Sequence, residues 1–296
     1  MSDSPPFLID IVYTWGGENM DQNNAREASC NELKYSLRSI FKNIPWFNKI
    51  YIVINTPVKQ NKPSWFNNKY SDRIILVDQN EIFPEEKRSQ LPCKVSGIIY
   101  TYLHLIPDLE EHYLYLNDDF FINKPLQYTE FFDPDGTKLY VHGSVRHYEK
   151  MNYDHNKYTE YPYIFNKHHH YVHIPYAITK SSTIDYINKY SEWIDWVRNL
   201  DYNKRRSEMC ELNGLYQPCF EHHYPYYIYM YINEKAIINN NLHEYNITAG
   251  ENMLIEMEKL SDKNSTFVIQ SGISKYKNDI VSFLDNKYPT KLYFEK

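Results

Sequence analysis

The sequence predicts an α/β fold built around a mainly parallel sheet. Short apolar, β-branched segments alternate with amphipathic segments along the first half of the chain, which is the order expected of parallel strands joined by crossover helices. Only 8 of the 296 residues are Gly, so a collagen-like or Gly-rich linker architecture is excluded. A chain of this length can bury a full core and can form either two domains or one large α/β domain; we expect a single domain over residues 1–296.

Continuous apolar segments mark the expected strands. Each is bounded by polar or Pro-containing segments, as buried strands commonly are. The first carries a carboxylate at Asp10, and the fourth ends directly before Asn117-Asp118-Asp119. The expected strands are residues 8–15, 49–55, 73–78, 112–116, 139–148 and 266–270.

Apolar residues at helical spacing mark the expected helices. In residues 31–43, Leu33 and Leu37 recur on one face, with Asn31 as the expected N-cap and Pro45 as the stop. Residues 8–148 would then form the α/β core, and residues 149–296 would complete a cleft. Further helices are expected over residues 94–106, 181–199, 224–238 and 277–286, and an extended aromatic loop over residues 150–176.

The composition excludes several classes of protein. The net charge of −6 argues against a nucleic-acid binder that depends on a basic surface. The four cysteines form no C-x-x-C pair and are expected to be free thiols. The first six residues do not resemble a signal peptide, and no run of about 18 apolar residues occurs, so we expect a cytoplasmic protein without an integral membrane segment.

The sharpest local signal for chemistry is Asn117-Asp118-Asp119. It follows an expected strand, and open α/β sheets bind ligands beyond the carboxyl ends of their strands. Two adjacent carboxylates repel each other, and a divalent cation held together with substrate phosphates would relieve that repulsion. The structural alternative is a solvated turn, because Asn and Asp are common turn residues.

Four other residues are candidates for binding or proton transfer. Asp10, in an apolar strand, is either a hydrogen-bonded structural acid or a nucleotide or metal contact. Arg38 could pair with Asp10 or grip a phosphate, and we expect the two to be close, because the helix of Arg38 should pack over that sheet. His173 is either an acid–base group or a structural histidine. Arg206 offers a cation for phosphate, or belongs to a solvated charged stretch.

The ordered set of segments resembles the Stealth family of sugar-1-phosphate transferases. That family includes capsular polysaccharide phosphotransferases and the catalytic chain of the lysosomal-enzyme N-acetylglucosamine-1-phosphotransferase. The segments that carry the resemblance are Ile9–Trp15 for the first region; Asn31–Phe41, Pro45-Trp46, Lys49–Asn55, Pro63–Trp65, Glu81–Phe83, Leu103–Pro107 and Tyr115–Asp119 for the second; His173–Tyr176 for the third; and Phe283-Leu284, Tyr288-Pro289 and Tyr293–Glu295 for the last.

The resemblance implies a fold of the nucleotide-sugar transferase (GT-A or Rossmann-like) type, with residues 8–148 binding the donor. It implies that a sugar-1-phosphate moves from a nucleotide sugar such as UDP-N-acetylglucosamine to a glycan hydroxyl, and that UMP is released. It further implies that Mg²⁺ or Mn²⁺ is held by Asp118 and Asp119. The remaining implied site residues are His173, Arg206 and Asp10 in catalysis, and Arg38, Asn55, Ser96 and Asn117 in substrate binding.

Two other functions stay open on the sequence. An ordinary nucleotide-sugar glycosyltransferase would use the same acidic pair and release UDP. A nucleotide-sugar- or glycan-binding protein that has lost catalysis is favoured by Lys94-Val95 and Gln270-Ser271, which stand where the family usually has other residues.

Overall fold

A central sheet flanked by helices organises the protein, which we describe from a computed structural model. Side chains at positions 193, 196, 270, 273 and 274 are not described. The structure describes residues 4–17, 30–67, 72–93, 95–142, 174–199, 226, 229–230, 233–239, 241–248, 250–270 and 273–296.

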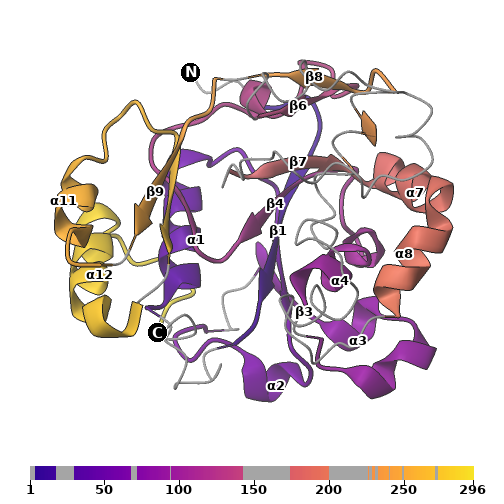
Figure 1. The fold of residues 1–296 in the computed structure, drawn as a ribbon, viewed down its shortest axis with the longest axis horizontal. Coiled ribbons are helices and arrows are strands. Elements are labelled where there is room, and N and C mark those ends of the chain that lie inside the picture. Colours follow the sequence, from indigo (N-terminus) through magenta and orange to yellow (C-terminus); the bar gives the residue numbers. More distant parts are fainter. Residues whose placement is uncertain are drawn as a thin grey trace.

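The central sheet has five strands (Figure 1). Their spatial order is β3 (Ile74–Asp78), β2 (Ile50–Ile54), β1 (Ile9–Trp15), β4 (His112–Asn117) and β7 (Tyr176–Thr179). The first four are parallel to their neighbours, and β7 runs antiparallel to β4. The predicted mainly parallel α/β fold is therefore confirmed, and the carboxyl ends of β1, β2 and β4 meet at one edge of the sheet.

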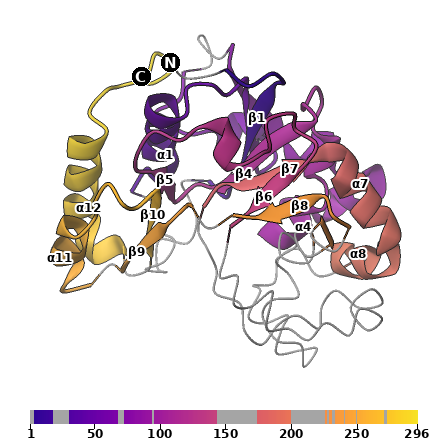
Figure 2. The same cartoon turned by 90° about the horizontal axis from the view of Figure 1, so that it is seen from above.

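Helices cover both faces of this sheet. Helix α1 (Glu32–Asn43) lies on one side, and α4 (Ser96–Tyr100), α7 (Lys180–Lys189) and α8 (Ser191–Arg198) lie on the other (Figures 1 and 2). Every residue of β2 is buried, and so is nearly all of β1. This is why β2 is a continuous apolar run, and why β1 is mostly apolar, instead of alternating apolar and polar residues.

A smaller sheet joins the two halves of the chain. Its order is β5 (Phe120–Ile122), β10 (Thr266–Gln270) and β9 (Glu244–Thr248), with β10 antiparallel to β5 and parallel to β9. Helices α11 (Met253–Glu258) and α12 (Ile273–Lys287) lie beside it, on the α1 side of the molecule (Figure 2). A second apolar core forms here from side chains of α1, β5, β9, β10, α11 and α12.

The shorter elements complete the connections. Strands β6 (Leu139–Val141) and β8 (Ala236–Ile238) pair in parallel. The remaining elements are α2 (Val58–Asn61), α3 (Gln79–Ile82) and 3-10 helices over Glu85–Gln90, Leu103–Leu105 and Tyr128–Glu130.

Three helix predictions need correction. The expected helix over residues 94–106 is only α4 and a separate 3-10 turn, and between them the Thr101 hydroxyl donates to the Ile98 carbonyl (2.7 Å), a side-chain bond that competes with helix continuation. The expected helix over residues 181–199 is divided into α7 and α8 at Tyr190. Residues 236–238, expected at the end of a helix, form strand β8, because they find a partner in β6.

The start of α1 also differs from the expectation. Asn31 adopts a left-handed backbone conformation (φ 60°), and its side chain makes no capping hydrogen bond. Instead, the carboxylate of Glu32 accepts a hydrogen bond from the backbone N–H of Cys30 (2.9 Å). The helix therefore begins with an acidic side chain in its first turn, where the helix dipole favours negative charge.

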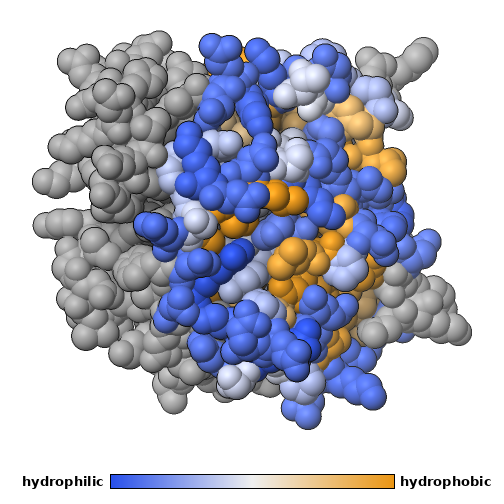
Figure 3. All heavy atoms as spheres, turned by 90° about the vertical axis from the view of Figure 1, so that its right-hand side faces the viewer, coloured by the Kyte–Doolittle hydropathy of each residue, from blue (hydrophilic) through white to orange (hydrophobic). Residues whose placement is uncertain are grey.

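The face shown in Figure 3 is mostly hydrophilic where it is described. Apolar side chains gather on the side of the molecule that carries α7 and α8 (Figure 3). Ile184 of α7 and Leu105 are among the large apolar residues that remain exposed. Within the described part of the chain, no helix is both long and apolar enough to cross a membrane.

Candidate active site

The acidic pair lies at the carboxyl edge of the central sheet. Asn117 is the last residue of β4 and is the register partner of Thr14 in β1. Asp118 and Asp119 form the turn between β4 and β5, and both are only partly buried. The pair therefore stands where two adjacent parallel strands end, as the sequence predicts.

Negative charge accumulates at this turn. The pKa of the Asp118 carboxyl lies well above its usual range, first because surrounding protein desolvates it and then because the charges of Asp119 and Glu32 oppose its ionisation. Burial raises the pKa of the Tyr13 and Tyr115 hydroxyls, and the charge of Asp118 adds to the rise. A cation bound here would offset the repulsion among these groups.

Glu32 acts on the candidate site, because its charge opposes the ionisation of Asp118, although no sequence pattern singled it out. Helix α1 follows the carboxyl end of β1 in the chain, so its first turn comes back to the edge where Asp118 lies. Four residues later on the same helix face, Ser36 bonds to the backbone of Phe120, directly after Asp119. The sequence shows that Glu32 and Ser36 are four residues apart and share a helix face. It does not show that Ser36 contacts Phe120.

A chain of hydroxyl groups orients Asn117. The Tyr115 hydroxyl donates to the side-chain carbonyl of Asn117 (2.9 Å), and because it has a single hydrogen, the Thr14 hydroxyl donates to Tyr115 (2.8 Å). Among the described residues, the side-chain amide nitrogen of Asn117 has no hydrogen-bond partner. The substrate-binding role of Asn117 stays a prediction.

Asn55, directly after β2, holds the loop that follows β1. Its amide nitrogen donates to the carbonyl of Gly16 (2.7 Å), and its carbonyl accepts from buried Gln79 (3.1 Å). Gln79 also exchanges two hydrogen bonds with the backbone of Cys93. These contacts are structural, and the substrate-binding role of Asn55 stays a prediction. The same holds for Ser96, which is exposed at the start of α4.

Asp10 lies at the opposite edge of the sheet, so its expected place in the donor pocket is corrected. It is fully buried and accepts hydrogen bonds from the Asn48 side chain (2.9 Å) and the backbone N–H groups of Lys49 (3.1 Å) and Glu110 (2.8 Å). It precedes Thr14 by four strand positions, or about 13 Å along β1. Burial raises the pKa of Asp10, and these hydrogen bonds partly oppose the rise.

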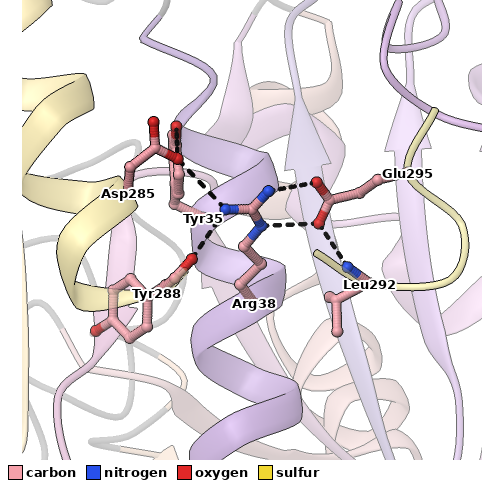
Figure 4. A network of polar contacts seen from close by, with 6 residues as sticks. All are labelled: Tyr35, Arg38, Asp285, Tyr288, Leu292 and Glu295. Atoms are coloured by element: carbon pink, nitrogen blue, oxygen red, sulfur yellow. Dashed lines mark hydrogen bonds and ion pairs between the residues drawn. The ribbon is translucent and has the colours of Figure 1, made fainter. Parts of the chain in front are cut away.

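Arg38 bonds to the C-terminal segment and not to Asp10, so the expected pair is wrong. Its Nε and Nη2 donate to the two carboxylate oxygens of Glu295 (2.8 and 2.6 Å), and Nη1 donates to the carbonyl of Tyr288 (2.8 Å; Figure 4). Asp285 adds a longer contact at 3.5 Å. With its guanidinium group engaged in this way, Arg38 anchors α1 to the end of α12 and is not placed to grip a phosphate.

Two predicted catalytic residues, His173 and Arg206, lie outside the described residues. Cys30 and Cys93 are buried free thiols, as expected, and burial raises the pKa of each to about 12. Cys210 and Cys219 also lie outside the described residues.

The donor set of the acidic turn fits a hard divalent cation. Within the described ranges, no group of three or more His, Cys, Asp or Glu side chains is arranged to hold a metal. Mg²⁺ does not require such a cage, because it is commonly held by one or two carboxylates together with water and substrate phosphates. Asp118 and Asp119 supply two carboxylates, and the pKa of Asp118 is raised by desolvation first and then by the charges of Asp119 and Glu32.

Comparison with known proteins places the acidic turn inside a known family region. The family model for Stealth protein CR2, conserved region 2, matches residues 26–140. A capsular polysaccharide phosphotransferase of Haemophilus influenzae is 34% identical over 166 residues, which cover 49% of this chain and 43% of that protein. The capsular polysaccharide phosphotransferase LcbA of Neisseria meningitidis is 34% identical over 151 residues (44% and 39%). An exopolysaccharide phosphotransferase of Streptomyces coelicolor is 36% identical over 147 residues (44% and 24%).

Residues 26–140 are therefore a Stealth conserved region 2, and the predicted resemblance is confirmed over this region. It contains Glu32, Arg38 and Asn117-Asp118-Asp119. The alignments span less than half the length of these three relatives. Among solved structures, the galactosyltransferase LgtC in complex with donor and acceptor sugar analogues matches 95% of each chain with a TM-score of 0.46 and 12% identity.

Proposed function

We propose that this chain is a metal-dependent sugar-1-phosphate transferase. It would move a hexose- or N-acetylhexosamine-1-phosphate from a nucleotide sugar to a glycan hydroxyl and release UMP when the donor is a UDP-sugar. The supporting observation is the pair Asp118-Asp119 at the carboxyl end of β4, within the Stealth conserved region 2. The relatives named above are polysaccharide phosphotransferases, which supports phosphate transfer as the reaction class.

The proposed reaction is a substitution at the β-phosphorus of the donor. The acceptor hydroxyl oxygen forms a bond to that phosphorus, and the bond from phosphorus to the oxygen bridging the two phosphates breaks. The bridging oxygen leaves with UMP, and the sugar-1-phosphate stays on the acceptor as a phosphodiester. His173 is proposed to accept the proton of the hydroxyl, and Arg206 to stabilise the transferring charge.

Each residue of the acidic turn has a separate part in this proposal. Asp118 and Asp119 hold Mg²⁺ or Mn²⁺, which neutralises charge on the donor phosphates when bound. Asn117 donates its amide hydrogen to a phosphate oxygen, since its carbonyl is already held by Tyr115. Glu32 strengthens the negative field that attracts the cation. Asp118 must be ionised to bind the metal, so metal affinity is expected to rise with pH.

The nucleotide product tests the proposal. The protein is incubated with UDP-N-acetylglucosamine, Mn²⁺ and a panel of oligosaccharides, and the nucleotides are separated. We expect UMP from the wild-type protein and from Asp279→Asn, an exposed control, and none from Asp119→Asn. Release of UDP would instead identify an ordinary glycosyltransferase. Binding of UDP and Mn²⁺ with no nucleotide released from any donor would identify a binding protein without catalysis.

The role of His173 needs its own test. His173→Ala is expected to lower turnover by about 10²- to 10⁴-fold, because general-base catalysis typically contributes that much, and to leave binding of UDP-N-acetylglucosamine nearly unchanged. Calorimetric binding and thermal unfolding are measured beside the rate. A variant that melts at a much lower temperature, yet turns over normally when folded, would show that His173 is structural.

A further inference from the structure

Among the strands of the described residues, β5 has a neighbour on one edge only. It is the edge strand of the smaller sheet and pairs with β10. Side chains of α1 bind the carbonyl of Phe120 and both backbone groups of Ile122. The Tyr288 hydroxyl also donates to the Ile122 carbonyl (2.9 Å). Three α1 side chains, all buried, thus take the place of a second strand: Ser36, Ser39 and Asn43.

Ser36 makes the contact nearest to the acidic pair. Its hydroxyl donates to the carbonyl of Phe120 (2.5 Å), and Phe120 directly follows Asp119. Because that hydrogen is used, the second contact of the hydroxyl, with Tyr13 (2.8 Å), is one in which Tyr13 donates. Ser36 thereby joins β1, α1 and β5 behind the turn.

Ser39 makes an equivalent contact farther from the pair. One turn along α1, its hydroxyl accepts a hydrogen bond from the backbone N–H of Ile122 (2.9 Å) and donates to the Ser36 carbonyl (2.7 Å). Ser36 and Ser39 are both fully buried on α1 and both bind the backbone of β5, but only Ser36 holds the residue adjacent to Asp119. Ser36 and Ser39 therefore offer a matched comparison within one helix.

We propose that Ser36 is a positioning residue for the metal-binding turn, which it holds through the carbonyl of Phe120. The inference rests on the proposed function, because it assumes that Asp118 and Asp119 bind a divalent cation. A metal site requires its carboxylates in a fixed geometry, and groups that orient the ligands commonly change metal affinity by about 10- to 100-fold when they are lost. A turn between two strands keeps that geometry only if β5 cannot shift.

Mn²⁺ affinity, measured on the full chain in the presence of UDP, tests this role without any need for turnover. Ser36→Ala removes the bond to Phe120, Ser39→Ala is the matched control, and Tyr13→Phe removes only the other partner of Ser36. We expect Ser36→Ala to weaken Mn²⁺ binding about 10-fold. Ser39→Ala and Tyr13→Phe should bind within about 2-fold of the wild type, although all three should melt at lower temperature, since each removes a buried hydrogen bond.

The outcomes separate this inference from the proposed function. Equal Mn²⁺ affinity in Ser36→Ala and wild type, or an equal loss in Ser39→Ala, would overturn the positioning role alone. A wild-type protein that binds no Mn²⁺ would overturn both. If Ser36→Ala does not fold, Ser36→Cys keeps the side-chain size with a weaker donor, and there the inference requires a loss of Mn²⁺ affinity larger than that of Ser39→Ala.

Discussion

Glu295→Gln removes one negative charge from the buried pair that anchors α1, with almost no change of shape. The Arg38 and Glu295 side chains are only 4% and 3% exposed, and two hydrogen bonds of 2.8 and 2.6 Å join them. Loss of one partner of a buried ion pair costs about 3–5 kcal/mol, because the remaining charge is left without compensation. The glutamine oxygen can keep one hydrogen bond, so we expect the free energy of unfolding to fall by about 3 kcal/mol, which corresponds to a Tm lower by roughly 6–12 °C.

Urea unfolding followed by circular dichroism measures this loss. The matched control is Asp285→Asn, which removes a carboxylate that contacts the same guanidinium at 3.5 Å but is 54% exposed, and it should cost less than about 1 kcal/mol. The double variant Arg38→Met/Glu295→Leu removes both charges and should be more stable than Glu295→Gln. A cost for Glu295→Gln no larger than that of Asp285→Asn would show that the buried Arg38–Glu295 pair does not anchor α1 more strongly than the exposed contact does.

Three further predictions concern the site and its surroundings. Asp118→Asn should raise the Tm of the metal-free protein at pH 7, because a carboxyl whose pKa is raised above 3.8 by folding destabilises the folded state once it ionises. The gain in Tm should vanish near pH 3, where the carboxyl is protonated. Calorimetry at both pH values measures the gain, and an unchanged Tm at pH 7 would contradict the prediction. Burial lowers the pKa of His104 and His142 to about 4. The free energy of unfolding should therefore fall by about 3 kcal/mol for each histidine as pH drops from 6.5 towards 4. His142→Gln should reduce the dependence of the urea midpoint on pH. Tyr115→Phe frees the Asn117 amide to rotate and should weaken binding of UDP with Mn²⁺, measured by calorimetry; unchanged affinity would mean that Asn117 does not contact the nucleotide.

The strands of the central sheet were predictable because burial on both faces leaves a simple signal. Runs such as Ile50–Ile54 contain no polar residue, and their order along the chain fixes the crossovers. The place of Asp118 and Asp119 followed from the same signal, since an apolar run ends directly before them. Strand β5 was not predicted, because three apolar residues after a polar turn are too short to show any periodicity.

The partners of buried charges were not predictable in this way. Asp10 and Arg38 both needed compensation, and pairing them was the simplest solution on one sheet and its helix. The structure instead gives Asp10 an amide and two backbone N–H groups, and gives Arg38 a carboxylate 257 residues later in the chain. Local patterns show that a charge needs a partner, but only the tertiary arrangement determines which one it finds.

The long sequence separation of Arg38 and Glu295 also bears on how the protein folds as it is synthesised. Helix α1 is synthesised before α12, so Arg38 lacks its carboxylate partner, and part of the apolar face of α1 stays uncovered, until α12 and Glu295 have been made. Contacts between residues this far apart slow folding, since a long loop must close before they form. The nascent chain therefore exposes an incomplete core around α1 until α12 has been made, and a binding partner that covers this surface would protect the chain from aggregation.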